Sequence, residues 1–202
     1  MIYNITKPAI LLMFSGGLDS LACLYLLLTK DEYKDYQLIV YHLNLINIEN
    51  RTLAEAISSK AIIEYFKANN YREFIYLESV HQSHAFTNGN FPWDTDVYNF
   101  VAGSVCYACP AVEKIVIGKT KTDDLESSGL PDRIDRANVL FDALKHEHQN
   151  KLYLVGEYTK QELYNLLPED LRDLSWSCRT PSYKEGKPIK CGRCKNCLTN
   201  WK

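Results

Sequence analysis

The sequence predicts an α/β protein with a doubly wound, mostly parallel sheet of five strands and a small C-terminal zinc-binding tail. Short apolar segments alternate along the chain with longer segments of helical spacing, as is typical of β-α-β units with parallel strands. A glycine-rich turn joins the first apolar segment to the first helical one. After residue 170 the composition shifts to cysteine and basic residues. We therefore expect an α/β domain over 1–170 and a zinc-binding segment over 171–202.

Five short apolar segments are the expected strands. The first of them, 9–14, is a continuous hydrophobic run after Pro8, which favours a strand buried on both faces. The expected strands are 9–14, 37–43, 73–77, 113–118 and 151–155. Ligands of parallel sheets bind beyond the carboxyl ends of the strands, so the turns that follow these segments should form the site.

The segments between the strands have helical character. In 51–68, apolar residues recur every three or four positions and form one stripe. The expected helices are 21–28, 51–68, 98–112, 132–149 and 160–167. His81 and His84 fall in a loop-like stretch, where solvated or substrate-proximal histidines are the favoured interpretation over metal ligands.

The turn between the first strand and the first helix reads Ser15-Gly16-Gly17-Leu18-Asp19-Ser20. Adjacent glycines permit unusual backbone angles and a close approach of a ligand to the main chain. The N–H groups of a helix N-terminus follow, where the helix dipole favours an anion. The turn therefore predicts a phosphate-binding loop, and the alternative is a glycine turn that only joins strand to helix. It is neither a Walker A loop, because no lysine follows the glycines, nor the dinucleotide fingerprint, because the glycines are adjacent.

Composition limits the classes of function. A formal net charge of −2 provides no overall basic field for nucleic acid. The first residues lack the layout of a signal peptide, and no apolar run approaches the roughly 20 residues that span a bilayer. A cytoplasmic location is the resulting expectation. In that compartment, seven cysteines favour metal ligands or core residues over a disulfide framework.

Four cysteines of the tail have the spacing of metal ligands. Cys178, Cys191, Cys194 and Cys197 follow the pattern C-x12-C-x2-C-x2-C. Four thiolates close a tetrahedral zinc sphere, so the expected site is structural. Redox cysteines or disulfides are the alternative. Cys106 and Cys109 also show C-x2-C spacing, but they lie in an apolar helical segment, where small core residues are the favoured interpretation.

The glycine turn resembles the S-G-G-x-D-S loop of the PP-loop family of N-type ATP pyrophosphatases. Together with the four-cysteine tail, it resembles the 7-cyano-7-deazaguanine synthase family within that group, and this resemblance implies an adenine nucleotide alpha hydrolase-like fold. Three further stretches are similar to that family. They are Ile115-Val116-Ile117-Gly118 followed by Asp123, Ser128-Gly129-Leu130-Pro131-Asp132-Arg133, and Tyr158-Thr159-Lys160-Gln161-Glu162.

The resemblance and the loop chemistry together assign candidate residues. The expected catalytic residues are Asp19, Ser20 and Asp123. The expected nucleotide-binding residues are Ser15, Gly16, Gly17, Asp19, Ser20 and Gly118. The expected substrate-binding residues are Ser128, Gly129, Pro131, Asp132 and Arg133. The cofactors are ATP, Mg²⁺ and Zn²⁺. Helix capping is the alternative role for Asp19 and for Asp132.

The family's reaction converts 7-carboxy-7-deazaguanine and ammonia to the nitrile through an adenylated carboxylate and an amide. The expected partners are therefore a deazapurine and ammonia, with a possible homodimer, and neither membrane nor nucleic acid. The chain departs from the family around the substrate crevice: Phe91 to Asn99 contains no arginine, and Leu130 replaces a tyrosine. The alternatives are another PP-loop enzyme, a tRNA thiolase or an amide-forming ligase, or a non-catalytic nucleotide- or deazapurine-binding module in DNA modification or defence.

Overall fold

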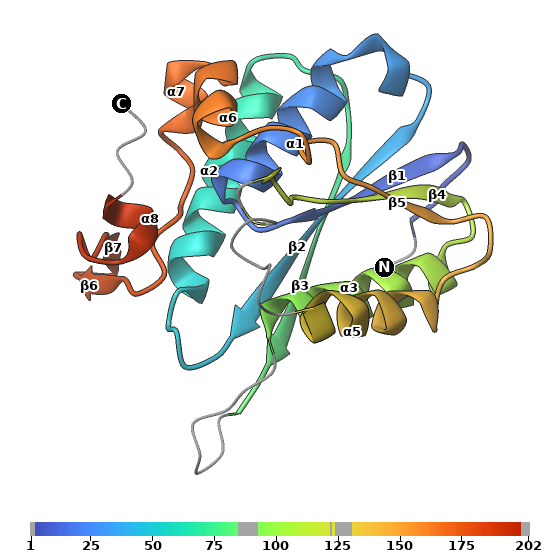
Figure 1. Cartoon of the computed structure of the whole chain (residues 1–202). Coiled ribbons are helices and arrows are strands. Elements are labelled where there is room, and N and C mark those ends of the chain that lie inside the picture. The colour runs from blue at the N-terminus through green and yellow to red at the C-terminus, as the bar shows by residue number, and fades with distance from the viewer. Residues whose placement is uncertain (1–2, 85–92, 122, 124–130, 199–202) are drawn as a thin grey trace.

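A five-stranded parallel sheet forms the centre of the molecule (Figure 1). The computed structural model describes residues 3–84, 93–121, 123 and 131–198, without the side chains of 131–133. The strands are β1 (Ala9–Phe14), β2 (Gln37–Ile46), β3 (Ile75–Gln82), β4 (Val112–Ile117) and β5 (Asn150–Leu152). Their order is β3-β2-β1-β4-β5, and all neighbours pair in parallel. The predicted α/β class and the doubly wound five-stranded sheet are confirmed.

Helices cover both faces of the sheet (Figure 1). One face carries α1 (Leu18–Thr29), α2 (Thr52–Ala68), α6 (Lys160–Leu166) and α7 (Glu169–Arg172), and the other carries α3 (Asp94–Ala108) and α5 (Pro131–Asp142). A single 3₁₀ turn, η1 (Asp31–Tyr33), follows α1. Successive side chains of β1 alternate between the two cores, since Ile10 and Leu12 pack with α1 whereas Leu11 and Met13 pack with α3. All six residues of β1 are buried, as its continuous apolar run predicts.

The strand order reverses at β1, which lies between β2 and β4. β2 and β3 lie on one side of β1, and β4 and β5 lie on the other. Because β1 and β4 are parallel neighbours, the loops that follow them open at the same edge of the sheet. The glycine turn follows β1 directly, and Gly118 follows β4 directly. The topology therefore places both at one crevice.

Several element boundaries differ from the sequence prediction. The helix expected over 132–149 ends at Asp142, because the chain must turn before β5. Gln149 is buried at that turn, and its side-chain amide donates to the Cys106 and Cys109 carbonyl oxygens at 3.0 and 3.3 Å. β3 extends to Gln82, so the histidine at position 81 lies in a strand rather than in a loop, because pairing with β2 continues to Ile46.

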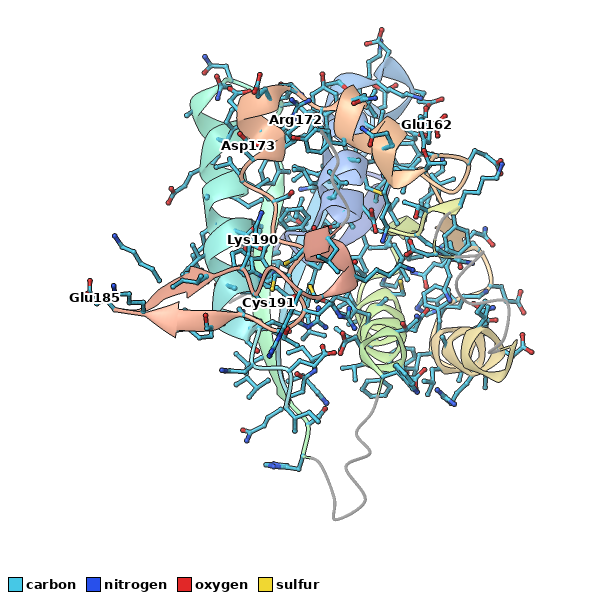
Figure 2. The ribbon with its side chains drawn as sticks, turned by 60° about the vertical axis from the view of Figure 1, so that its left-hand side comes forward. Glu162, Arg172, Asp173, Glu185, Lys190 and Cys191 are labelled. Atoms are coloured by element: carbon cyan, nitrogen blue, oxygen red, sulfur yellow. The ribbon has the colours of Figure 1, made fainter. Side chains whose placement is uncertain are left out.

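The C-terminal tail is a small unit beside α2 (Figure 1). It contains the antiparallel pair β6 (Ser182–Lys184) and β7 (Lys187–Ile189), followed by α8 (Lys195–Leu198). Figure 2 shows Glu185 at the tip of this hairpin and Cys191 on the chain between the hairpin and α8. Among the helices that the structure describes, none has the length and apolar character needed to cross a membrane.

Candidate active site and metal centre

The phosphate-binding loop predicted at residues 15–20 is the turn between β1 and α1. Gly16 has a φ of +78°, and a Cβ atom there would lie 2.7 Å from the Ser59 Oγ and 3.1 Å from the Glu55 carbonyl oxygen. A side chain is therefore excluded both by backbone conformation and by space. Gly17 is the N-cap of α1 and provides no side-chain cap for the helix. The first N–H groups of a helix have no partner within the helix, and together with the helix dipole they favour an anion.

Two serine hydroxyls close the loop on itself. The Ser15 and Ser20 Oγ atoms lie 3.1 Å apart, and the Gly17 N–H donates to the Ser15 Oγ at 3.3 Å. The Ser20 hydroxyl donates to the Gly17 carbonyl oxygen at 3.1 Å. These short-range bonds keep the loop in one conformation before any ligand arrives.

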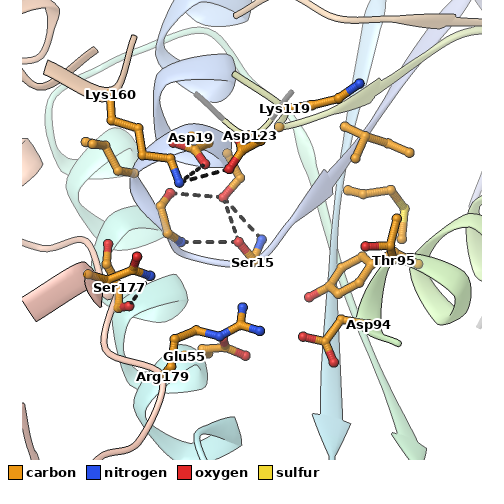
Figure 3. Close-up of a pocket in the computed structure, with 18 of the residues that line it drawn as sticks. Ser15, Asp19, Glu55, Asp94, Thr95, Lys119, Asp123, Lys160, Ser177 and Arg179 are labelled. Carbon is orange, nitrogen blue, oxygen red and sulfur yellow. Dashed lines mark hydrogen bonds and ion pairs between the residues drawn. The ribbon is translucent and has the colours of Figure 1, made fainter. Parts of the chain in front are cut away.

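A lysine and two aspartates meet above the loop (Figure 3). The Lys160 Nζ lies 3.0 Å from the Asp123 Oδ1 and 3.6 Å from the Asp19 Oδ2. Burial raises the pKa of Asp123, but hydrogen bonds from Thr120 and the charge of Lys160 outweigh this effect, so the pKa lies below its usual value. Asp123 is therefore ionised at neutral pH and holds the lysine over the loop.

The sequence prediction does not include Lys160 as a site residue, although the family-like stretch 158–162 contains it. Thr159 caps α6, accepting a hydrogen bond from the Glu162 N–H, while the Glu162 carboxylate accepts one from the Thr159 N–H. This capping box places Lys160 in the first helical position, with its side chain toward α1. The Thr-x-x-Glu pattern could have located the helix start, but only the tertiary packing brings the lysine to Asp19.

The loop lines a pocket of about 600 Å³. Its lining includes the loop, the start of α3, part of α5, Gly118 after β4, and the first residues of the tail. Gly118 packs so closely on α1 that a Cβ there would lie 2.9 Å from the Ser20 nitrogen. The chain after β4 therefore needs a glycine to approach the phosphate loop.

A buried arginine, Arg51, also lines the pocket. Arg51 is 9% exposed, and its guanidinium pairs with Glu49 at 2.7 Å, with Glu55 at 2.5 Å and with Asp94. Burial raises the pKa of Glu55 even though the charge of Arg51 opposes this shift. The stretch 91–99 contains no arginine. Asp94, the first residue of α3, instead binds Arg51, which precedes the first residue of α2. The four-residue spacing of Arg51 and Glu55 could have pointed to that pair, but no local spacing links Arg51 to Asp94.

His42 supports the loop from below. Its Nδ1 lies 2.8 Å from the Phe14 carbonyl oxygen, at the end of β1, and 3.1 Å from the Ser59 Oγ. Complete burial lowers the pKa of His42, so the ring is neutral and can donate from Nδ1 to the carbonyl. This side chain positions the strand end from which the loop departs.

The predicted substrate-binding residues are only partly covered by the structure. Ser128 and Gly129 lie outside the described residues. Pro131, Asp132 and Arg133 form the first turn of α5, and their side chains also lie outside the described part of the chain. Asp132 is inside this helix rather than at its N-cap. Three later residues of α5, Ile134, Ala137 and Asn138, line the pocket, so the helix faces the predicted crevice.

The four predicted metal ligands come together. The Sγ atoms of Cys178, Cys191, Cys194 and Cys197 all lie within 4.8 Å of one another, and those of Cys191 and Cys197 are 3.9 Å apart. A zinc–sulfur bond of 2.3 Å places tetrahedral ligands about 3.8 Å apart, so the four thiols fit a single zinc ion after a small contraction. A four-iron cluster gives each cysteine its own iron and therefore holds the sulfur atoms farther apart.

Backbone donors support the same cysteine cluster. The Cys191 N–H donates to the Cys178 Sγ and the Cys194 N–H to the Cys191 Sγ, each at 3.3 Å. Such donors stabilise thiolates in a metal site. Cys106 and Cys109 belong to no cluster of this kind among the described residues. Burial raises the pKa of Cys106 to about 12, which suits a thiol of the core.

Comparison with known proteins adds information on the fold. No family model matches this sequence, and no curated protein matches it. Among solved structures, it is similar to the U34-tRNA thiolase NcsA from Methanococcus maripaludis, solved with its [4Fe-4S] cluster. The TM-score is 0.53 at 16% identity, over 86% of this chain and 59% of the thiolase. This chain thus spans about three-fifths of the thiolase. At such identity the likeness shows the fold alone, an α/β fold with a central parallel sheet.

Proposed function

We propose that this protein uses ATP to adenylate a carboxylate, and that its reaction converts 7-carboxy-7-deazaguanine and ammonia to 7-cyano-7-deazaguanine. One observation carries the proposal: the phosphate loop, Lys160 and the four-cysteine tail all border the same pocket. This combination matches what the sequence resemblance implies for the synthase family. The fold shared with a tRNA thiolase supports the coarser part, an ATP-using enzyme.

In this proposal the loop binds the β- and γ-phosphates of ATP. Its N–H groups and the hydroxyls of Ser15 and Ser20 donate hydrogen bonds to the phosphate oxygens. The Lys160 ammonium, 3.6 Å from Asp19, neutralises charge that develops on the leaving pyrophosphate. Asp19 and Asp123 are the carboxylates that would hold Mg²⁺, an ion that commonly binds through one or two carboxylates together with substrate phosphates. Bound Mg²⁺ supplies further neutralisation of the phosphate charge.

The chemistry requires activation because a carboxylate repels nucleophiles and oxide is a poor leaving group. Attack of the carboxylate oxygen on the α-phosphorus gives an acyl adenylate and releases pyrophosphate. Ammonia displaces AMP to form the amide. A second ATP adenylates the amide oxygen with release of a second pyrophosphate, and loss of AMP and of both N–H protons leaves the nitrile. The protein's part is to orient these groups and to exclude water.

A tRNA thiolase is the second candidate, favoured by the similar solved structure. Thiolation needs a cysteine near the nucleotide and a surface for tRNA. Among the described pocket residues, Cys178 is the one cysteine, and it belongs to the metal cluster. The net charge of −2 also favours a small substrate over RNA. We therefore rank the thiolase second.

The test is incubation of zinc-loaded protein with 7-carboxy-7-deazaguanine, ammonium and Mg-ATP. Mass spectrometry should detect the nitrile, and AMP and pyrophosphate should form in step with it. A parallel reaction contains a tRNA transcript and a sulfur donor. Thiolated tRNA without nitrile would select the second candidate. If ATP and the deazapurine bind but neither reaction forms a product, the protein is the non-catalytic binding module.

A further inference from the structure

We propose that the four-cysteine centre and the nucleotide site are thermodynamically coupled, so that Zn²⁺ on the cysteines tightens nucleotide binding and the nucleotide tightens Zn²⁺ binding. The connection is the segment 174–178, which contacts the phosphate loop at Gly16 and ends at the first cysteine ligand. This inference rests on the proposed nucleotide site. It makes Ser58 and Trp176 positioning residues for the loop.

On the loop side, the Gly16 carbonyl oxygen receives two donors from outside the loop. The Trp176 backbone N–H donates to it at 3.0 Å, and the Ser58 Oγ lies 2.9 Å away. The Ser58 Oγ is also 2.7 Å from the Leu174 carbonyl oxygen, so its single proton is shared between the tail segment and the loop. Ser58 is 5% exposed, which shields these bonds from water. Gly16, the loop residue with the left-handed backbone conformation, is therefore held by segment 174–178, which leads to the first cysteine of the cluster.

On the metal side, the same segment is bonded to the cysteine-bearing chain. The Asn196 side-chain amide donates to the Ser177 carbonyl oxygen at 2.8 Å, and Asn196 lies in α8 between two of the cysteines. The Trp176 indole N–H donates to the Cys178 carbonyl oxygen at 3.0 Å. Trp176 and Cys178 also line the pocket itself. The metal ligands are thus one or two hydrogen bonds away from the phosphate loop.

In this proposal metal binding orders the chain after Cys178, because that part of the tail has little apolar packing of its own. No residue of β6, β7 or α8 is buried. Such a segment cannot offset its loss of conformational entropy by hydrophobic burial. Metal–thiolate bonds have to supply that stabilisation instead. Without the metal, Asn196 and Cys178 lose their fixed positions, and the Gly16 carbonyl loses its donor from Trp176. A loop that must be ordered during binding has a lower affinity for its ligand.

The experiment measures both sides of the coupling. Calorimetric titration with a non-hydrolysable ATP analogue and Mg²⁺ gives the nucleotide Kd of the Zn²⁺-loaded and Zn²⁺-free protein. We expect the Zn²⁺-free protein to bind about 5- to 150-fold more weakly, the usual range of coupling between two sites. Competition with a chromophoric chelator gives the Zn²⁺ affinity with and without the analogue, which must change by the same factor.

Ser58→Ala tests the route of the coupling. This variant keeps all four cysteines, and it should lower the coupling factor toward one, by at most about tenfold, through the loss of one shared hydrogen bond. Ser104→Ala is the matched control, since the Ser104 hydroxyl bonds the Phe100 carbonyl oxygen on the exposed side of α3. It should leave the factor unchanged. If circular dichroism shows the Zn²⁺-free protein unfolded, the two variants are compared with Zn²⁺ saturating, where Ser58→Ala should bind the analogue more weakly than Ser104→Ala.

Equal nucleotide affinity with and without Zn²⁺, in folded protein, would overturn the coupling while leaving the proposed nucleotide site intact. An unchanged coupling factor in Ser58→Ala would show that the coupling does not pass through the contact of Ser58 with Gly16 and Leu174. Absence of nucleotide binding in both forms would instead contradict the proposed function. The inference would be supported if Zn²⁺ and the nucleotide analogue change each other's affinity by the same factor, and if this factor falls in Ser58→Ala but not in Ser104→Ala.

Discussion

Replacement of Gly16 by alanine is the most direct test of the phosphate loop. Gly16 and Gly186 have nearly the same backbone conformation, with φ of +78° and +76°. A Cβ at position 16 would lie 2.7 Å from the Ser59 Oγ and 3.1 Å from the Glu55 carbonyl oxygen, whereas a Cβ at position 186 meets nothing within 4 Å. Gly186→Ala therefore lowers the free energy of unfolding only through the strained backbone conformation. Gly16→Ala lowers it further, because the added Cβ also collides with its neighbours.

The two costs can be estimated separately. A non-glycine residue held in a sparsely populated left-handed region destabilises by about 1–3 kcal/mol. Forcing a methyl group into a filled site adds about 1–3 kcal/mol, because Ser59 can rotate but the Glu55 backbone in α2 cannot move alone. Gly16→Ala should thus be about 2 kcal/mol less stable than Gly186→Ala. In a domain of this size, that difference lowers the Tm by about 4–8 °C.

Thermal denaturation of the Zn²⁺-loaded variants measures the difference in stability, and calorimetry with the ATP analogue measures the function of the loop. Gly186 lies in the turn between β6 and β7, next to Glu185 at the tip of the hairpin (Figure 2). Gly186→Ala should therefore bind the analogue as the unmodified protein does. Gly16→Ala should bind it far more weakly, because the displaced loop no longer directs its N–H groups to the phosphates. Equal Tm values for the two variants, or undiminished binding by Gly16→Ala, would refute this reasoning.

Three further predictions concern the groups around the loop and the metal. The pKa of Asp123 is lowered on folding, so its contribution to stability is complete above the unfolded-state pKa of about 3.9 and is lost as the pH falls through the folded-state value. Denaturation measured from pH 6 to 2 should therefore show that the free energy of unfolding decreases less with falling pH in Asp123→Asn than in the unmodified protein. An identical decrease would contradict the ion pair. Lys160→Met should weaken binding of the ATP analogue about 10- to 100-fold through loss of a charge-assisted contact, while Lys187→Met on exposed β7 should not. Elemental analysis should find about one zinc per chain, lost in Cys191→Ser and retained in Cys109→Ser; equal zinc in both variants would rule out the proposed ligand set.

Local patterns in the sequence were sufficient for the main features of the fold. β1 and α1 were predictable because a buried strand needs a continuous apolar run and the glycine turn interrupts it at a definite residue. The cysteine cluster was predictable because two of the intervals between its members are only three residues long, so that short turns bring the sulfur atoms together. The end of α5 was not predictable in this way. It depends on the burial of Gln149 against carbonyl oxygens of α3, which are about forty positions away in the chain.

Residues close together in the chain are enough to predict the α/β class, the glycine turn after β1 and the set of four cysteines. Other features appear only when the chain is folded: Lys160 lies beside Asp19 and Asp123, Arg51 pairs with Asp94, and the Trp176 N–H bonds the Gly16 carbonyl oxygen. These contacts join distant segments. Their partners are selected by the order of strands in the sheet and by the packing of helices on it, and no pattern within one segment encodes that choice.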